Sequence, residues 1–293
     1  MSPVHRPVLL DEVVAGLSPR EGSVIVDGTA GAGGHAAALA SRVGASGRVV
    51  AIDRDPAMLD LAAKATEGLP VTLVRGSYRE MRDVLDELGI DRVDGVVLDL
   101  GLSSDQLAWA GRGFSFAREG PLDMRFDPDQ RLTAADIVHS WSEKDLADLF
   151  FQLGEERHSR RVARRVVEAR KAGRIETTTE LADIVRRSIP GKWGPIDPAT
   201  RVFQALRIAV NDELGHLDAT LVALPDLLKI GGRAAIISFH SLEDRRVKWA
   251  FRNDPRWTVV TRKPITATAE EVRTNPRARS AKLRVAERCP NPS

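Results

Sequence analysis

Short β-branched runs alternate with helix-forming segments along the first third of the chain, and this alternation constrains the fold most. Strands are predicted at 23–28, 47–55, 71–77 and 93–101, and helices at 34–43, 56–66 and 78–88. Strands that alternate with helices favour a parallel sheet built from right-handed βαβ units. The chain is therefore predicted to contain a doubly wound α/β domain.

The pattern returns near the C-terminus. We predict a helix at 216–232, a strand at 233–240, and a hairpin of two further strands at 257–263 and 281–288. About 130 residues separate the fourth strand from the fifth, although a whole βαβ unit needs only about 30. The surplus is predicted to be an inserted helical domain with helices at 142–153, 155–173, 177–189 and 198–214. The expected organisation is therefore a sheet domain at 1–104 and 216–293, with an all-helical insertion at 105–215 for substrate recognition.

Composition narrows the class of protein. Hydrophobic residues make up 43% of the 293, which is enough for a core, and the formal net charge is only +2. The single cysteine, Cys289, excludes an intramolecular disulfide framework and a cysteine-cluster metal site, and no metal is expected. Because no apolar run reaches the length of a membrane span, we expect a cytoplasmic protein without membrane partners.

The stretch VDGTAGAGGH, at 26–35, places a glycine-rich loop between the first predicted strand and helix. Gly31, Gly33 and Ala36 satisfy the pattern G-x-G-x-x-A, and Asp53 follows the second strand. This spacing is typical of dinucleotide-binding domains, in which the acid binds a ribose hydroxyl. An NAD-dependent oxidoreductase is therefore one candidate function.

Charge favours a different cofactor. Asp27, Asp53 and Asp99 lie at the C-terminal ends of the first, second and fourth predicted strands. Carboxylates beside the loop repel a pyrophosphate but attract the sulfonium and ammonium groups of S-adenosylmethionine. Each acid alone can also serve as a helix or turn cap. Taken together, the three acids favour a methyltransferase over a nicotinamide enzyme.

Basic residues cluster in two segments, which indicates a nucleic-acid substrate. The first cluster has one acid, Glu168, among Arg157, Arg160, Arg161, Arg164, Arg165, Arg170, Lys171 and Arg174. The second has one acid, Glu287, among Arg273, Arg277, Arg279, Lys282, Arg284 and Arg288. Such clusters can neutralise phosphates and make binding depend on salt, although a solvated helix face is the simpler alternative. Trp109, Trp141 and Trp193 fall in the insertion, where they either stack on a base or pack in a core.

The chemistry of the methyl acceptor is restricted by the position of the only cysteine. Methylation at pyrimidine C5 needs a cysteine nucleophile, and Cys289 lies close to the C-terminal end. An exocyclic amine or a hydroxyl is therefore the expected acceptor. Asp99 is placed to orient such a group toward the methyl donor, and His240, after the fifth strand, is placed to relay a proton.

Several longer stretches resemble one family, that of the RsmH/MraW 16S rRNA (cytosine-N4)-methyltransferases of bacteria. The matching stretches are HRPVLLDEV, VDGTAGAGGH, AIDRDP, DGVVLDLGLSSDQL, RGFSF, GPLDMRFD, TRVFQALRIAVN, SFHSLEDRRVK and NPRARSAKLR. They occur in family order from the N-terminal segment to the tail. The resemblance implies a Rossmann-like class I methyltransferase fold, S-adenosylmethionine as cofactor and a cytidine in the decoding region of 16S rRNA as substrate.

The resemblance also implies a set of site residues. The cofactor contacts carried over by motif are Gly33, Gly34, His35, Asp53, Tyr78, Asp99 and Gln106. Tyr78 would lie near the adenine, where the family more often has phenylalanine. Ala30 and Phe126 also depart from the family pattern, in which a larger apolar residue and a methionine are usual.

Three functions remain in competition at the level of sequence. They are an rRNA N4-methyltransferase acting on 16S rRNA within the small ribosomal subunit, an NAD-dependent oxidoreductase, and a non-catalytic RNA-binding protein. Binding of NADH without S-adenosylmethionine favours the second, and RNA affinity without methyl transfer favours the third. The sequence leaves open whether the protein forms a homodimer.

Overall fold

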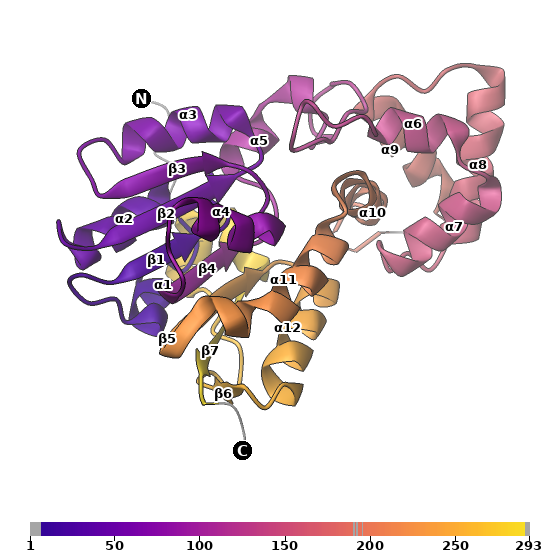
Figure 1. Ribbon diagram of the computed structural model, residues 1–293. Helices are drawn as coiled ribbons and strands as arrows, with labels where there is room; N and C mark the ends of the chain where they lie inside the picture. Colours follow the sequence, from indigo (N-terminus) through magenta and orange to yellow (C-terminus); the bar gives the residue numbers. More distant parts are fainter. Residues whose placement is uncertain (1–6, 190, 192, 195, 291–293) are drawn as a thin grey trace. The chain divides into compact units, whose positions relative to one another are not determined.

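The computed structural model describes residues 7–189, 191, 193–194 and 196–290. The chain divides into two compact units (Figure 1). The sheet unit comprises Met1–Ser103 and Leu214–Ser293, and the helical unit comprises Ser104–Glu213. In the described part of the chain, no helix is both long enough and apolar enough to cross a membrane.

The sheet unit is built on one sheet of seven strands in the order β3-β2-β1-β4-β5-β7-β6. The strands are β1 (Val24–Asp27), β2 (Arg48–Asp53), β3 (Val71–Arg75), β4 (Val93–Asp99), β5 (Leu228–Ser238), β6 (Trp257–Val259) and β7 (Lys282–Arg288). The first five strands are parallel, whereas β7 runs antiparallel to both of its neighbours. The predicted parallel α/β fold and the C-terminal hairpin are thus confirmed.

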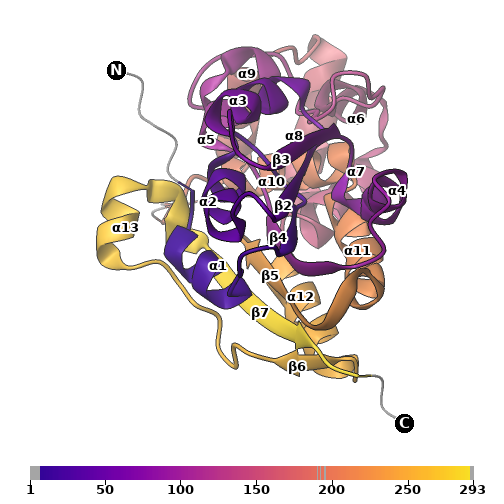
Figure 2. The ribbon, with the colours of Figure 1, turned by 60° about the vertical axis from the view of Figure 1, so that its left-hand side comes forward.

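Helices cover both faces of this sheet (Figure 2). They are α1 (Leu10–Leu17), α2 (Gly34–Val43), α3 (Pro56–Ala65), α4 (Met81–Glu87), α11 (Glu213–Leu227), α12 (Ser241–Asn253) and α13 (Ala269–Thr274), with the short 3-10 turns η1 (Tyr78–Glu80) and η3 (Pro276–Ser280). Successive strand residues enter different cores, because side chains alternate across a strand. Val26 packs with α4, α11 and α12, whereas Ile25 packs with α1 and α2.

Several elements differ from the sequence-based expectation. The helix predicted at 216–232 ends at Leu227, and β5 begins at Leu228, so the assignment of the last five of these residues to a helix is wrong. Leu228 pairs with Val93 on β4, and a register shift follows before Arg233 pairs with Gly95. Pairing with a neighbouring strand is a long-range effect that the local glycine signal did not reveal. The helices α1 and α12 were not predicted.

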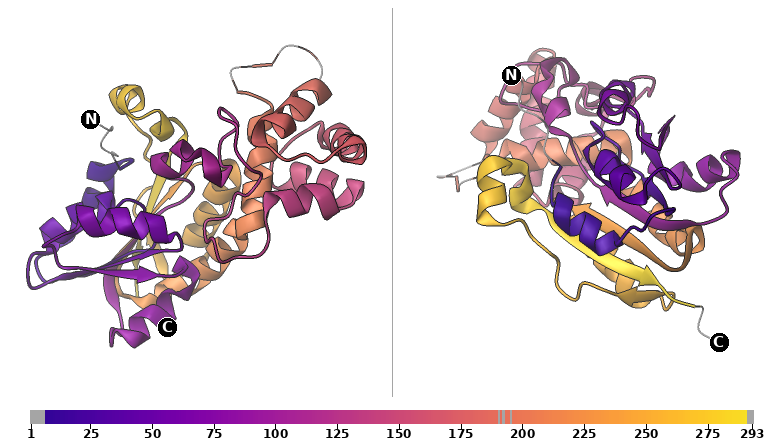
Figure 3. Two further views of the ribbon diagram at one scale, coloured as in Figure 1. Left: turned by 90° about the horizontal axis from the view of Figure 1, so that it is seen from above. Right: turned by 90° about the vertical axis from the view of Figure 1, so that its left-hand side faces the viewer.

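The helical unit contains α5 (Ser104–Ala108), η2 (Ala110–Arg112), α6 (Ala134–Ser140), α7 (Glu143–Gln152), α8 (Ser159–Ala172), α9 (Thr178–Ser188) and α10 (Ala199–Asn211). Figure 3 shows its helices from two further sides. Local sequence starts several of them, since Thr133 and Thr177 form capping boxes with the acids three residues later. Their apolar faces meet in a core that includes Phe150 and Val162, both fully buried.

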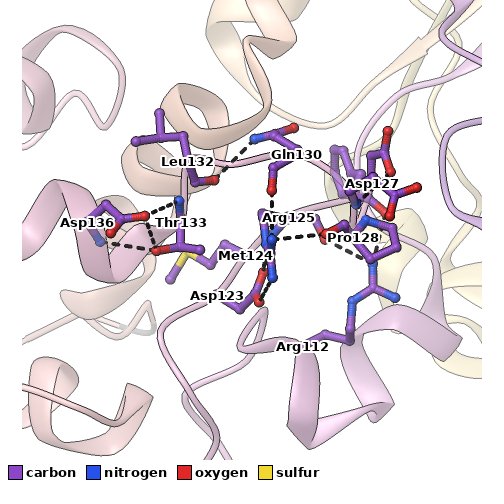
Figure 4. Close-up of polar contacts among 12 residues, drawn as sticks. Arg112, Asp123, Met124, Arg125, Asp127, Pro128, Gln130, Leu132, Thr133 and Asp136 are labelled. Atoms are coloured by element: carbon purple, nitrogen blue, oxygen red, sulfur yellow. Dashed lines mark hydrogen bonds and ion pairs between the residues drawn. The ribbon is translucent and has the colours of Figure 1, made fainter.

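The long segment between η2 and α6 is held by its own arginines (Figure 4). Arg125 donates to both carboxylate oxygens of Asp123, at 2.9 and 2.7 Å, and to the carbonyl of Gln130 at 2.7 Å. Arg112 donates to the carbonyls of Arg125 and Phe126, each at 2.9 Å. Bidentate pairing of this kind fixes geometry as well as charge. The segment is therefore an ordered loop, and the unusual Phe126 stacks on Phe114 at a ring distance of 5.4 Å.

Candidate functional site

Three carboxylates lie at one edge of the sheet. Asp27, Asp53 and Asp99 are the last residues of β1, β2 and β4. These strands are parallel neighbours in the order β2-β1-β4, so their carboxyl ends meet at the same edge. Ligands of open α/β sheets bind at this edge, beside the strand where the order of connection reverses.

Asp27 is the most deeply placed of the three. Its side chain is fully buried, and the Thr29 backbone N–H donates to its Oδ1 at 3.1 Å. Its Oδ2 is buried and has no hydrogen-bond partner. Burial raises the pKa of Asp27 to about 6, against the opposing effects of nearby His35 and the Thr29 hydrogen bond. At neutral pH the site thus holds a buried negative charge that lacks a full set of partners.

Asp53 connects the carboxylate edge to the glycine loop. The N–H of Gly31 donates to its Oδ2 at 2.8 Å, and the N–H of Asp55 donates to its Oδ1 at 2.9 Å. Burial raises the pKa of Asp53 to about 6, although both hydrogen bonds act in the opposite direction. Each carboxylate oxygen can accept a second hydrogen bond. Asp53 can therefore bind a ribose hydroxyl while it continues to hold the loop.

The glycine loop packs tightly against three other segments. A Cβ on Gly28 would lie 2.5 Å from Leu98 Cδ2, and one on Gly34 would lie 2.3 Å from Pro7 Cγ. Gly33 has a φ of 86° and precedes α2 as its N-cap. The loop thus needs glycine both for close approach and for left-handed backbone. The segment that begins at Pro7 lies against the loop; the His5 and Arg6 of the motif HRPVLLDEV lie outside the described residues.

Replacing Gly33 with alanine is expected to destabilise the sheet unit by about 2–4 kcal/mol, because overpacking adds to the left-handed strain. The new Cβ would lie 2.9 Å from the backbone Cα of Ala62. Gly68→Ala is the matched control, since Gly68 also has a positive φ but has no atom within 4 Å of that position. It should cost only about 1 kcal/mol. Urea unfolding measures both values, and equal losses would contradict the packing argument.

The side chain of His35 lies next to that of Asp99. It is buried in the first turn of α2, and its Nε2 lies 3.0 Å from the carbonyl oxygen of Val8. A carbonyl can only accept, so Nε2 carries the proton. Its Nδ1 lies 3.9 Å from Asp99 Oδ2, and the Asp99 N–H donates to the Thr29 hydroxyl at 2.6 Å. The histidine is therefore held in one orientation, and its other nitrogen faces the Asp99 carboxylate.

Tyr78 follows β3 and reaches the same loop. It begins η1, which Ser77 and Glu80 cap reciprocally. The Cβ of Tyr78 would lie 2.9 Å from a Cβ on Gly28. The ring packs edge-on against His216, with a ring distance of 6.3 Å. Ser77 Oγ is 3.0 Å from His216 Nδ1, so the α11 histidine orients this corner of the site.

Two predicted site residues have different surroundings. His240 is the N-cap of α12, where its Nδ1 accepts from the Glu243 N–H at 3.4 Å and its Nε2 is 3.2 Å from Glu243 Oε1. This capping role is sufficient to explain the histidine, and its proposed role in proton transfer stays a prediction. Gln106 lies in α5, in the helical unit. The sheet unit brings together the other predicted residues, which are Gly33, Gly34, His35, Asp53, Tyr78 and Asp99.

These residues fit S-adenosylmethionine better than a dinucleotide. The unpartnered Oδ2 of Asp27 and the raised pKa of two carboxyls indicate negative charge that a cation would stabilise. A pyrophosphate at the same place would add charge of the wrong sign. Asp53 keeps acceptor capacity for a ribose diol.

The sheet order, with its antiparallel β7, and the acidic carboxyl edge define a class I, Rossmann-like methyltransferase that uses S-adenosylmethionine. The model of the MraW methylase family matches residues 2–289. The chain belongs to this family. The nicotinamide oxidoreductase is therefore set aside.

Individual relatives are similar along their whole length. The chain is 50% identical over 289 residues to the "Ribosomal RNA small subunit methyltransferase H" of Deinococcus radiodurans, covering 98% of this chain and 91% of that protein. The protein of the same name from Sorangium cellulosum is 50% identical over 287 residues, covering 97% and 90%. A solved rRNA methylase from Streptococcus thermophilus has a TM-score of 0.45 and 13% identity, covering 96% and 94%.

Sequence reasoning missed several residues that shape this site. Asp27 is predicted from its charge but is not among the predicted cofactor contacts, although it is the one fully buried carboxylate of the three and burial raises its pKa to about 6. His216 follows Ser77 by 139 residues, and no local signal connects them. Val8 belongs to a recognised motif, but its role as the acceptor for His35 depends on tertiary packing.

Proposed function

We propose that this protein transfers a methyl group from S-adenosylmethionine to the N4 amine of a cytidine in the decoding region of 16S rRNA. The observation that carries the proposal is the row of carboxylates at the ends of β1, β2 and β4, of which Asp27 is fully buried, combined with the family assignment. The relatives are named as methyltransferases of small-subunit rRNA, which supports the same substrate here. We place the reaction in the cytoplasm, on rRNA within the small ribosomal subunit.

The cofactor would be held by residues of the sheet unit, with a contribution from Gln106. Backbone at Gly33 and Gly34 would approach it closely, Asp53 would accept from the ribose hydroxyls, and Tyr78 would lie against the adenine. Asp27 would stabilise the positive charge from below. When bound, S-adenosylmethionine supplies an electrophilic methyl group.

Asp99 would position the cytidine. Its carboxylate accepts a hydrogen bond from the exocyclic amine, which turns the nitrogen lone pair toward the donor. His35 lies beside this carboxylate, with its Nε2 donating to the carbonyl of Val8 and its Nδ1 3.9 Å from Asp99 Oδ2. An amine oriented in this way needs little base strength from the enzyme. His240 would relay the proton that leaves by accepting it on Nδ1, which requires release of the hydrogen bond from the Glu243 N–H.

A cysteine nucleophile has no place in this reaction. Cys289 follows β7, is half-buried, and its Sγ lies 3.3 Å from the carbonyl oxygen of Pro255. It is therefore engaged at the β6–β7 side of the sheet, two strands from β4. Transfer to an exocyclic amine needs no covalent bond to the pyrimidine ring, which agrees with the position of the only cysteine.

The test is mass spectrometry of nucleosides from 16S rRNA of cells with and without the gene. We expect N4-methylated cytidine to disappear on deletion and to return with the wild-type gene. A complementing gene with Asp99→Asn should restore the protein but not the modified nucleoside. Unchanged N4-methylated cytidine in the deletion strain would overturn the proposal. RNA binding by purified protein without any transfer would favour the non-catalytic alternative.

A further inference from the structure

A cavity of about 410 Å³ opens on the helical unit between α7 and α8. Three arginines line it, Arg157, Arg160 and Arg161, against one acid, Asp148. Asp148 is already paired with Lys144, whose Nζ lies 3.0 Å from its Oδ2. Within the described residues, no acidic side chain pairs with any of the three arginines. The cavity therefore has a positive wall that is available to an anion.

The same basic segment behaves differently one turn further along α8. Arg164 lies 3.8 Å from Glu143, and Arg165 donates to Glu168 at 2.9 Å. Arg170 donates to the carbonyl of Val138 at 2.6 Å. Acids or carbonyls thus already bind these three basic residues. The basic cluster thus has two parts. Arg164, Arg165 and Arg170 pair with acids or carbonyls of the protein, whereas Arg157, Arg160 and Arg161 line the cavity.

The loop that precedes α8 and carries Arg157 is anchored to the rest of the helical unit. Glu156 points inward, is 3% exposed, and its Oε1 accepts from the His158 N–H at 2.7 Å. Gly154 approaches α10 so closely that a Cβ would lie 2.5 Å from the carbonyl oxygen of Arg201. Arg157 and His158 follow directly, and α8 begins at Ser159 with no acid in its first turn. A site formed in advance loses less entropy when its ligand binds.

An aromatic ring completes the cavity. Phe150 and Phe151 are neighbours on α7, yet Phe150 is fully buried in the core whereas Phe151 is 62% exposed and lines the cavity. Large exposed aromatic rings beside positive charge are typical of surfaces that bind single-stranded nucleic acids, where bases stack on the ring and arginines neutralise phosphates. An inorganic anion has no base to stack on the ring, so it would not explain why Phe151 lines the cavity.

We propose that the cavity between α7 and α8 binds one nucleotide of a single-stranded RNA segment, with its phosphate on Arg157, Arg160 and Arg161 and its base on Phe151. The choice of RNA as the ligand rests on the proposed function. The site lies wholly within the helical unit and takes no part in methyl transfer. It holds the substrate strand at a nucleotide other than the methylated cytidine.

The first test compares two double variants on the same helix. The probe is a fluorescein-labelled single-stranded RNA of about ten nucleotides, within the usual site size, and fluorescence anisotropy gives its Kd over a range of KCl concentrations. Arg160→Gln with Arg161→Gln should raise Kd about tenfold or more and lower the slope of log Kd against log salt by up to about 0.7, the value for one phosphate neutralised on a single strand. Arg164→Gln with Arg165→Gln changes the net charge equally and should raise Kd less than about threefold.

The second test asks whether a base is bound as well as a phosphate. Phe151→Ala should raise Kd for the RNA about tenfold, because stacking on an aromatic ring is lost. The same variant should bind an abasic ribose-phosphate strand of equal length as the wild type does. Ile196→Ala removes another exposed apolar side chain of the helical unit and should leave both affinities unchanged.

The outcomes separate the proposal from its alternatives. Equal weakening by the two arginine pairs would mean that only the diffuse charge of α8 attracts RNA, and would overturn the site. No effect of Phe151→Ala on the RNA would mean an anion site without base recognition, and would overturn the assignment to a nucleotide. Both tests use equilibrium binding of exposed-residue variants, so they stand apart from the nucleoside analysis. If N4-methylated cytidine persists in the deletion strain, the proposed reaction is wrong, but the binding site can still be correct. If the binding tests fail, the site is wrong, but the proposed reaction can still be correct.

Discussion

An Asp99→Asn variant should lose methyl transfer by at least about 100-fold, which is the usual effect of removing a polar group that orients a reacting atom. The amide carbonyl can still accept from the exocyclic amine, but it carries no charge and therefore makes a weaker hydrogen bond, and the amide NH2 adds donors that the carboxylate lacks. The loss of charge also removes the partner that faces His35 Nδ1 at 3.9 Å. Single-turnover rates with unmodified 16S rRNA measure the effect, and calorimetry measures binding of S-adenosylmethionine.

Asp94→Asn is the matched control for this experiment. Asp94 lies on the same strand, β4, but toward its other end, where it pairs with Lys229 at 2.9 Å and accepts from the Val24 N–H at 2.8 Å. Its replacement should cost some stability and leave the rate of transfer close to the wild-type value. A wild-type rate for Asp99→Asn, or an equal loss in both variants, would remove Asp99 from the site.

An Asp27→Asn variant should be more stable than the wild type at pH 8 and should bind S-adenosylmethionine more weakly. Burial raises the pKa of Asp27 in the folded protein to about 6, from 3.8. A raised carboxyl pKa contributes stability below the unfolded value, and this contribution is lost as pH rises through about 6. The ionised side chain therefore costs the folded protein up to about 3 kcal/mol at pH 8. Asparagine has nearly the same shape and carries no charge.

The measurement is urea unfolding of both proteins between about pH 4 and about pH 8, a window that includes the raised pKa of Asp27, about 6. The stability gained by the variant should grow as pH rises through about 6 and vanish at the acid end. Asp53, whose pKa is also raised to about 6, is present in both proteins, so its effect on the pH dependence of stability cancels in the difference between them. Asp254→Asn is the control of opposite sign, because a hydrogen bond from Arg256 lowers the pKa of Asp254. A destabilised Asp27→Asn variant at pH 8 would show that the carboxylate has a stabilising partner.

Stability and cofactor affinity are expected to change in opposite directions at Asp27. A side chain that is unfavourable for folding and buried at the ligand-binding edge of a sheet indicates a functional requirement. Its charge is compensated when a cation binds, so binding should also lower the pKa of Asp27. The weaker affinity of Asp27→Asn then measures how much the negative charge contributes to cofactor binding. The higher stability of the variant measures how much the same charge destabilises the protein without cofactor.

Much of the sheet unit could be predicted because its signals are local. Buried parallel strands are continuous apolar runs in the sequence. Each of the three acids lies next to the turn at the end of its strand, so strand and acid can be recognised together. Asp27, Asp53 and Asp99 fall within the last three residues of their predicted strands, which places the acids at one edge once the strands are known to be parallel. The beginning of β5 was misassigned because Leu228 is a strand residue only through its pairing with Val93. The capping role of His240 could not be predicted, because it depends on helix α12, which the sequence analysis did not identify.

The sequence by itself determined the alternation of strands and helices, the acids at the strand ends, the glycine loop and the family. These follow from the chemistry of neighbouring residues and need no knowledge of the packing. Only the tertiary structure decided which of these groups are buried, and hence that Asp27 has a pKa of about 6 and that His216 supports Tyr78. It also decided that Arg160 and Arg161 face a cavity while Arg164 and Arg165 face acids. Burial and partner choice depend on residues far apart along the chain, which meet only when the helices pack.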